Sequence, residues 1–331
     1  MDFVKDMKDK ARSMQKRLVL PEGTEPRTVK AARILVDDAL AASVTLLGKE
    51  SGIRAAAERE GVKLDGITIV DPASSGKAGL YAGNYHELRK HKGMTIEQAG
   101  TEITDPLRWA AMMVRLGDAD VSVAGAENTT GDVLRAGLTI IGTVQGLKTA
   151  SSCFVMTGLD PLWGKEGSLI LSDCAVVPDP SPEQLADITQ SAAQSCREFL
   201  GVEPVAALMS FSTKGSAKHD DVAKVQNAVE ILKSRNPGFV FDGELQADAA
   251  LVPSVTDKKA PGSPVRGKVN TLIFPDLGSG NIGYKLVQRL GKADAFGPFL
   301  QGFAKPISDL SRGASVEDIV VTCAVTLSRA K

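Results

Sequence analysis

The sequence has few aromatic residues, almost no net charge and no long hydrophobic run. Aromatic side chains make up 5% of the 331 residues, and 39 basic residues face 40 acidic ones. Nucleic-acid binding would need a basic patch and stacking rings, and an anionic membrane would attract an excess of positive charge, so neither partner is expected. No apolar run approaches the ~18 residues of a membrane-spanning helix.

Signals of targeting and of disulfide or zinc sites are also missing. The N-terminal segment, MDFVKDMKDKARSMQKR, is charged and amphipathic and lacks the apolar core of a signal peptide, so we expect a cytoplasmic protein. The four cysteines lie far apart and form no C-x-x-C pair, which predicts free buried thiols in a reducing compartment: Cys153, Cys174, Cys196 and Cys323.

Motifs of several common enzyme classes do not occur. There is no G-x-x-x-x-G-K-[ST] loop and no G-x-S-x-G turn, which argues against a P-loop NTPase and weakens a serine hydrolase interpretation. His86 and His91 are five residues apart, so one helical face cannot place both on a zinc ion. This spacing argues against a zinc site on that helix.

What is present is a regular alternation of strands and helices. Strands predicted at 17–20, 43–47 and 67–70 are separated by helices, which indicates an α/β fold with mostly parallel sheets. Further along we expect one helix over 95–116, a helix with Arg135 in its first turn, and a loop up to Lys268. The strand at 270–274 is the last clear one, and the later segment AFGPFLQGF is interpreted as a loop.

Polar residues crowd a link near the C-terminus, Lys305 to Val320, with the sequence KPISDLSRGASVEDIV. Ser311, Arg312 and Gly313 would form a turn that carries one hydroxyl and one fixed cation. An arginine fork matches a phosphate, and the N–H groups of a helix start add positive potential. The S-x-x-D spacing of Ser315 and Asp318 predicts a capping box at that helix start.

Other cations lie beside loops at strand ends. The polar loop 125–132 follows a strand, at the position where open α/β sheets bind ligands. Each cation alone is an ordinary surface charge, but together with the glycine- and serine-rich loops they predict a cleft for a phosphate-bearing anion. The cations are Arg89, Arg135, Lys214 and Arg312.

A glycine motif offers a competing interpretation. Gly278, Gly280 and Gly283 match G-x-G-x-x-G between a strand and a helix, which is the fingerprint of a dinucleotide site. The motif occurs late in the chain, and no acidic residue follows at the distance that ribose recognition needs. A glycine loop that lines a ligand cleft is therefore preferred over an NAD site.

Segments along nearly the whole chain resemble the phosphate acetyltransferases, in a short form with the catalytic part alone. They are LPEGTEPRTVKAA, ELRKHKGMT, GAENTTGDVLRAGLTIIGT, SFSTKGSAKH, NTLIFPDLGSGNIGYKLVQRL and GPFLQGFAKPISDLSRGASVEDIV. The resemblance implies reversible acyl transfer between acetyl phosphate and coenzyme A, which is a co-substrate and not a bound cofactor. It implies no metal ligated by the protein. It also implies a homodimer and a two-domain fold like that of isocitrate and isopropylmalate dehydrogenases, with the site in the cleft between the domains.

The resemblance also assigns residues and domains. Ser311 and Arg312 match the pair beside the acyl phosphate, Asp318 matches the catalytic aspartate, and Arg89 and Arg135 match arginines that bind coenzyme A. Further substrate-binding residues are expected in matching segments at Ser212, Lys214, Gly278 and Gly280. Residues 1–147 with 305–331 are expected to form domain I, and residues 148–304 domain II. An active-site cysteine of some members finds no match near Asp160 and Pro161.

The expected chemistry is direct attack of the coenzyme A thiolate on the acyl phosphate in a ternary complex, with Asp318 as the base. Three alternatives stay open. A phosphate butyryltransferase would use the same chemistry on a larger acyl group. A β-decarboxylating NAD(P) dehydrogenase would share the fold, and an acyl-CoA-sensing module would bind without catalysis.

Overall fold

The structure is a computed structural model that describes residues 2–331. These residues form two compact units, one of residues 2–144 with 303–331 and one of residues 145–302. Each unit has its own sheet and its own hydrophobic core. The assignment of functional domains I and II stays a prediction.

The unit of residues 2–144 and 303–331 is built on a five-stranded sheet in the order β11-β4-β1-β2-β3. All four strand pairs are parallel, as the alternation of strands and helices predicted. The strands are β1 (Arg17–Leu20), β2 (Ser43–Leu47), β3 (Ile67–Val70), β4 (Val121–Ala124) and β11 (Ile307–Asp309).

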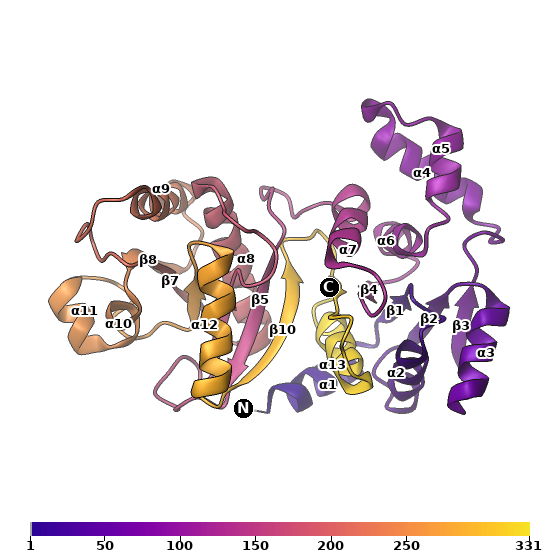
Figure 1. The fold of residues 1–331 in the computed structure, drawn as a ribbon, viewed down its shortest axis with the longest axis horizontal. Helices are drawn as coiled ribbons and strands as arrows, with labels where there is room; N and C mark the ends of the chain where they lie inside the picture. Colours follow the sequence, from indigo (N-terminus) through magenta and orange to yellow (C-terminus); the bar gives the residue numbers. More distant parts are fainter. Residues whose placement is uncertain (1) are drawn as a thin grey trace. The chain divides into compact units, whose positions relative to one another are not determined.

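Helices cover both faces of this sheet (Figure 1). One face carries α2 (Pro26–Asp37), α3 (Glu50–Glu60) and α13 (Val316–Leu327), with α1 (Phe3–Met14) packed on α13. The other face carries α6 (Pro106–Leu116) and α7 (Thr130–Ala136) with the π-helical turn η2 (Gly137–Ile141). Between β3 and α6 the chain forms α4 (Ala78–Arg89), the 3-10 turn η1 (Lys90–Lys92) and α5 (Ile96–Glu102).

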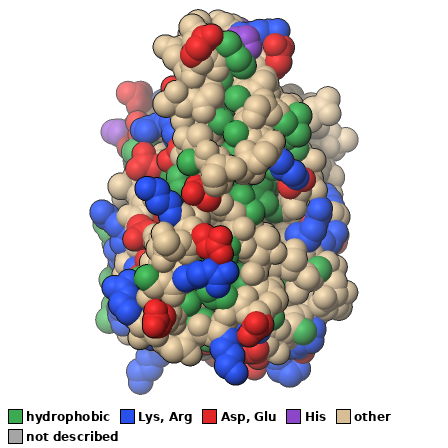
Figure 2. All heavy atoms as spheres, turned by 90° about the vertical axis from the view of Figure 1, so that its right-hand side faces the viewer, with side chains coloured by type: hydrophobic (Ala, Val, Ile, Leu, Met, Phe, Trp, Pro, Cys, Tyr) green, Lys and Arg blue, Asp and Glu red, His purple; other side chains and the backbone are tan. Residues whose placement is uncertain are grey.

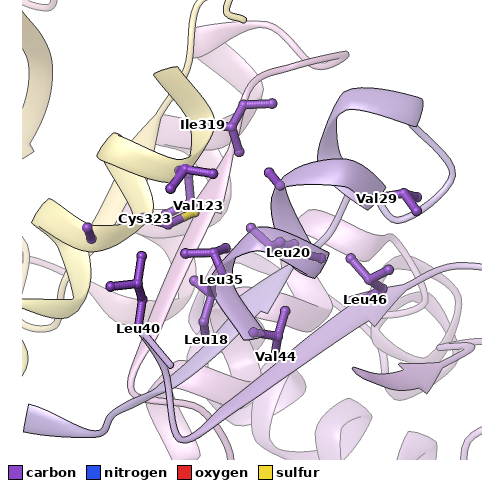
Figure 3. Close-up of a cluster of buried hydrophobic side chains, with 14 of the residues drawn as sticks. Leu18, Leu20, Val29, Leu35, Leu40, Val44, Leu46, Val123, Ile319 and Cys323 are labelled. Atoms are coloured by element: carbon purple, nitrogen blue, oxygen red, sulfur yellow. The ribbon is translucent and has the colours of Figure 1, made fainter. Parts of the chain in front are cut away.

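The core of this unit joins the first strands to the last helix. Ile319 and Cys323 of α13 point into a cluster that also contains Leu18 and Leu20 of β1 and Leu35 of α2 (Figure 3). All five side chains are buried. Because α13 is packed into this core, the C-terminal end of the segment before it, residues 311–315, is held in place.

Three sequence predictions in this unit were wrong. The helix expected over 95–116 is broken into α5 and α6, because Asp105 caps α6 and Pro106 occupies its first turn. Arg135 lies in the last turn of α7, since Thr129 caps that helix earlier than expected. Ile307–Asp309 forms the edge strand β11 inside what looked like a polar link.

The unit of residues 145–302 contains a six-stranded sheet in the order β10-β5-β6-β9-β7-β8. The three pairs from β6 to β8 are parallel, whereas β10 with β5 and β5 with β6 are antiparallel. The strands are β5 (Ser151–Thr157), β6 (Leu169–Ser172), β7 (Val205–Met209), β8 (Val240–Leu245), β9 (Thr271–Ile273) and β10 (Asp294–Gln301).

Helices pack on this second sheet as well. α8 (Pro182–Leu200) and α12 (Leu277–Leu290) lie on opposite faces (Figure 1), and α9 (Asp220–Arg235) packs beside α8. The other two helices are α10 (Ala247–Leu251) and α11 (Pro253–Lys259). The predicted loop up to Lys268 therefore contains a helix that was missed.

The apolar segment AFGPFLQGF was also misassigned as a loop. It contributes most of β10, and the register with β5 shifts between Phe296 and Phe299, around Gly297 and Pro298. Within sheets proline is found at edge strands and bulges, and glycine weakens a strand and often marks a bulge; β10 is an edge strand. The overall prediction of an α/β fold with mostly parallel sheets is confirmed.

Three general properties were visible in the sequence. The cysteines are free and buried as predicted, and burial raises the pKa of the Cys174, Cys196 and Cys323 thiols. Acidic and basic side chains are interspersed on the face drawn in Figure 2, in keeping with the net charge of −1. Within residues 2–331, every helix is too short or too polar to cross a bilayer.

Candidate active site

A short exposed turn after β11 holds Ser311 and Arg312. The N–H of Ala314 donates to the carbonyl of Ser311 at 2.9 Å, and the N–H of Gly313 donates to Ser311 Oγ at 3.2 Å. Ala314 is buried, so the end of the turn is anchored in the core. Because Ser311 Oγ only accepts in these contacts, its proton stays available for an external acceptor.

The guanidinium of Arg312 has no hydrogen-bond or ion-pair partner within residues 2–331. Among the described residues, Arg312 makes a single hydrogen bond, in which its backbone carbonyl accepts from Arg27. An exposed arginine fork without a protein partner matches the geometry of a phosphate. The turn therefore presents one hydroxyl donor next to one uncommitted cation.

Asp318 stands in the first turn of α13 and closes the predicted capping box with Ser315. Its Oδ2 accepts from the N–H and from the hydroxyl of Ser315, each at 2.8 Å, while Ser315 Oγ accepts from the N–H of Asp318 at 3.1 Å. Asp318 is exposed, and its Oδ1 has no protein donor in the described chain. Capping thus uses one carboxylate oxygen and leaves the other accessible.

The loop after β4 is held by a carboxylate that sequence reasoning missed. Glu22, which is buried, accepts from the backbone N–H groups of Gly125, Ala126, Glu127 and Asn128 at 2.8–3.1 Å. The Asn128 side-chain amide donates to it as well, at 2.8 Å. These N–H groups would otherwise form an anion-binding nest. The Glu22 carboxylate already occupies this nest, so these N–H groups are not available to a phosphate.

A second buried carboxylate lies between β11 and α7. Asp309 is 4% exposed, its Oδ2 accepts from Thr130 Oγ1 at 2.5 Å, and its Oδ1 is buried without a partner. Burial raises the pKa of Asp309 to about 6, and the nearby Glu22 adds to the rise while the Thr130 hydrogen bond opposes it. Asp309 is the last residue of β11 and lies two positions before Ser311, so its hydrogen bond from Thr130 ties the strand end before the turn to α7.

The two predicted coenzyme A arginines lie at the ends of helices in the same unit. Arg89 is the last residue of α4, and its Nε is buried without a hydrogen-bond partner. Arg135 pairs with Asp132 at 3.1 Å and keeps 67% of its side chain exposed. No hydrogen bond or ion pair among residues 2–331 joins either arginine to the Ser311–Asp318 segment.

Ser212 and Lys214 lie in the other unit, and both are committed to protein partners. Ser212 is fully buried, donates to Glu244 Oε1 at 2.9 Å and accepts from the Ala217 N–H at 3.1 Å. The Lys214 ammonium forms an ion pair with Asp242 and donates to the Gly243 carbonyl. A direct substrate contact by either side chain would require these contacts to change.

Gly278 and Gly280 open α12 in that unit, behind the capping residue Asp276. Gly278 is exposed. Gly280 is buried, and a Cβ atom there would clash with the carbonyl oxygen of Asp173. The structural requirement for glycine at 280 is therefore close packing of α12 on the loop after β6.

Groups of three or more histidine, cysteine, aspartate or glutamate side chains with metal-binding geometry do not occur in the part of the chain that the structure describes.

The sequence model of the family described as "Phosphate acetyl/butaryl transferase" matches residues 2–327, almost the whole chain. The chain belongs to this family. Its members are acyltransferases that exchange an acyl group between phosphate and coenzyme A.

Individual relatives agree with this assignment. A phosphate acetyltransferase of Treponema pallidum (strain Nichols) is 60% identical over 330 residues, which cover 99% of this chain and 98% of that protein. A phosphotransacetylase structure from Streptococcus pyogenes is 38% identical, with a TM-score of 0.92 over 99% of this chain and 98% of that one. A 4-hydroxythreonine-4-phosphate dehydrogenase from Klebsiella pneumoniae, 13% identical, aligns with a TM-score of 0.53 over 96% of this chain and 100% of its own. This last likeness shows a shared, dehydrogenase-like fold and nothing about activity.

The resemblance found in the sequence is thus confirmed at the level of family and fold. The roles given to individual residues stay predictions, as does a site between the domains. Sequence reasoning did not find Glu22, Asp309 or Arg27, the three charged residues whose side-chain contacts hold the loops of the candidate site. Glu22 and Arg27 belong to the matching segment LPEGTEPRTVKAA, and Asp309 to the link before Ser311, but only their distant contacts reveal what they do.

Proposed function

We propose that this chain transfers an acetyl group between acetyl phosphate and coenzyme A by direct attack of the thiolate, without an acyl-enzyme intermediate. One observation carries the proposal. A turn with a free hydroxyl and an unpaired guanidinium lies just before a helix start whose aspartate keeps one oxygen accessible. Acyl transfer from a phosphate to a thiol needs a phosphate holder, a hydrogen-bond donor and a base.

In this mechanism Asp318 Oδ1 accepts the thiol proton of coenzyme A. A thiol with a pKa near ~8.5 is only slightly ionised at neutral pH, and the thiolate is the nucleophile. The sulfur then forms a bond to the acetyl carbon while the bond from that carbon to the phosphate oxygen breaks. The proton held by Asp318 passes to the departing phosphate, so the carboxylate is regenerated.

Arg312 and Ser311 act on the other side of the reacting bond. The Arg312 fork holds the phosphate and neutralises its charge as it leaves, and the Ser311 hydroxyl donates to a phosphate or carbonyl oxygen. The support is that neither donor is used by the protein itself. The N-terminus of α13 follows this loop directly, and the helix dipole adds positive potential there.

Coenzyme A is proposed to bind through its phosphates at Arg89 and Arg135. The unpartnered Nε of Arg89 and the exposure of Arg135 are what an anion-binding pair needs. Further substrate-binding positions are proposed at Ser212, Lys214, Gly278 and Gly280. Ser212 and Lys214 would have to exchange their internal bonds for bonds to the substrate.

Two properties of the whole protein belong to the same proposal. We propose a cytoplasmic homodimer, and the second copy is proposed to cover α12. Ile282, Leu286 and Leu290 lie one helical turn apart and are 61%, 52% and 79% exposed, whereas Tyr284 and Val287 face the core.

The test of the reaction is thioester formation from coenzyme A with acetyl phosphate and, in parallel, with butyryl phosphate, without added nucleotide. Fast turnover with acetyl phosphate is expected. Turnover with butyryl phosphate alone would keep the chemistry and replace the substrate. Turnover with neither would overturn the proposal and direct attention to nicotinamide binding at the Gly278 loop.

A further inference from the structure

Arg27, in the first turn of α2, reaches two loops of the candidate site at once. Its Nη1 donates to the carbonyl of Arg312 at 2.9 Å and to the carbonyl of Ala314 at 2.7 Å. Its Nη2 donates to the carbonyl of Ala126 at 3.0 Å. One side chain therefore ties the turn after β11 to the loop after β4, through backbone atoms on both sides.

The guanidinium of Arg27 is itself held in place by Glu25. Its Nε donates to Glu25 Oε1 at 2.7 Å, and Glu25 Oε2 accepts from the N–H of Thr28 at the start of α2. Glu25 is buried, and it caps the helix that carries Arg27. A planar fork with this many directed bonds has one orientation, so the carbonyls that it binds have one orientation too.

We propose that Arg27 is a positioning residue for acyl transfer. Resting on the roles proposed above for Ser311 and Arg312, the inference is that Arg27 fixes the turn from which both side chains project. The Arg312 guanidinium makes no hydrogen bond or ion pair with any of the residues that the structure describes, so the backbone of the turn decides where it points. Loss of the two carbonyl anchors releases the turn between β11 and α13, while α13 stays packed in the core.

The same helix offers a matched control. Arg33, also on α2, donates from Nη1 to the carbonyls of Lys63 and Asp65 and pairs with Asp37 at 2.7 Å. It anchors the turn between α3 and β3, which contains no candidate site residue. Its side chain is 20% exposed, against 31% for Arg27. Truncation of either arginine removes comparable bonds, but of the two only Arg27 contacts the turn that carries Ser311 and Arg312.

The test compares Arg27→Ala, Arg27→Lys and Arg33→Ala in the full chain. We expect kcat for acetyl transfer to fall about 10- to 100-fold in Arg27→Ala, because a small misplacement of a catalytic group has an effect of this order. The KM for coenzyme A should change much less. Arg33→Ala should keep kcat within about twofold of the wild-type value. Its melting temperature should fall by about as much as that of Arg27→Ala, because both variants lose comparable bonds. Guanidinium ions at millimolar concentration should restore part of the kcat of Arg27→Ala.

Arg27→Lys keeps the test decisive if the alanine variant does not fold. Lysine preserves the charge but cannot bind three carbonyls in one plane, so kcat should still fall while the melting temperature stays near that of the wild type. Two outcomes would overturn the inference. One is a normal kcat in both Arg27→Lys and Arg27→Ala. The other is a normal kcat in Arg27→Lys when Arg27→Ala does not fold. Equal losses of kcat in Arg27→Ala and Arg33→Ala would overturn it as well.

A double-mutant cycle with Arg312→Gln separates this inference from the proposed function. If Arg27 acts through the turn, the loss of kcat in the double variant is smaller than the product of the two single losses. Independent, multiplicative losses would overturn the positioning role. A near-normal kcat in Arg312→Gln would instead overturn the phosphate role of Arg312. A low kcat in Arg312→Gln with a normal one in Arg27→Ala would overturn the role of Arg27 alone.

Discussion

Asp318 has a structural contact and a free oxygen on the same carboxylate. Oδ2 is held by Ser315, which fixes the rotamer, and Oδ1 is left at the exposed start of α13. The capping box therefore orients the proposed base and does not compete with it. A catalytic carboxylate held in this way meets its substrate without losing side-chain entropy in the complex.

Replacement of Asp318 by asparagine separates the two functions. The amide oxygen still accepts from Ser315, so the cap is retained, but the side chain can no longer take a proton. We expect Asp318→Asn to lower kcat by about 10²–10⁴-fold with little change in melting temperature. Steady-state kinetics and thermal unfolding measure the two effects.

Ser315→Ala is the matched variant. It removes the hydroxyl cap and should lower the free energy of unfolding by about 1 kcal/mol, with a much smaller loss of kcat than Asp318→Asn. If Asp318→Asn instead keeps its kcat and only loses stability, Asp318 is a cap and not a base.

Asp309 connects a single side chain to the pH dependence of stability. Its pKa is about 6 in the folded chain, against an ordinary value of 3.8. The folded state therefore binds the proton more tightly than the unfolded state, so this contribution to stability is complete below pH 4 and is lost as the pH rises through 6. A difference of this size corresponds to about 3 kcal/mol.

We expect Asp309→Asn to remove this loss. Its free energy of unfolding, measured by urea denaturation from pH 4 to pH 8, should fall less with rising pH than that of the wild type. Asp38→Asn, at an exposed aspartate without a side-chain partner in the described chain, serves as the control. Parallel curves for wild type and Asp309→Asn would contradict a raised pKa at this position.

At the scale of elements, α12 shows why two glycines of one motif differ. Gly280 faces the loop after β6, where only a hydrogen fits against the Asp173 carbonyl. Gly278 faces outward, and the nearest atom to a Cβ there is Asp276 Oδ1 at 3.2 Å. The spacing that suggested a dinucleotide loop thus includes one position that helix packing explains.

Gly280→Ala should therefore lower the free energy of unfolding by about 1–3 kcal/mol, because α12 must move away from the sheet. Gly278→Ala should leave it unchanged or raise it by up to about 1 kcal/mol, since alanine favours the helix. Chemical denaturation of the two variants checks both values. Equal losses would show that the contact with Asp173 does not decide the effect.

At the scale of the whole molecule, the exposed stripe of α12 is the proposed contact with a second copy. Leu286 lies at its centre, between Ile282 and Leu290. A charge placed there would be buried without a partner in the dimer and would be solvated in the monomer. We expect Leu286→Glu to shift the chain from dimer to monomer in sedimentation velocity experiments.

Leu162→Glu is the control for that experiment, because Leu162 is 79% exposed in a loop and lies outside α12. It should leave the dimer intact. A wild-type chain that sediments as a monomer would exclude the dimer, and a dimeric Leu286→Glu variant would exclude this helix as its contact.

The sequence by itself determined the elements whose signals are local. The S-x-x-D spacing placed the start of α13 behind Ser315, and the alternation of strands and helices placed β2 and β3 at their observed bounds. Turns, caps and the motifs that carry the family resemblance involve residues a few positions apart, so they can be read from one segment at a time.

Only the tertiary structure decided which distant residues meet. Glu22 binds a loop 103 residues away and Arg27 a turn 285 residues away, and neither partner leaves a mark near these residues in the sequence. β10 and β11 were missed because an edge strand with Gly297 and Pro298, or a strand of three residues, is stabilised by its neighbour and not by its own propensity. The residue types of the candidate site could be read from the sequence. The positions of its loops depend on long-range contacts that form only when the chain folds.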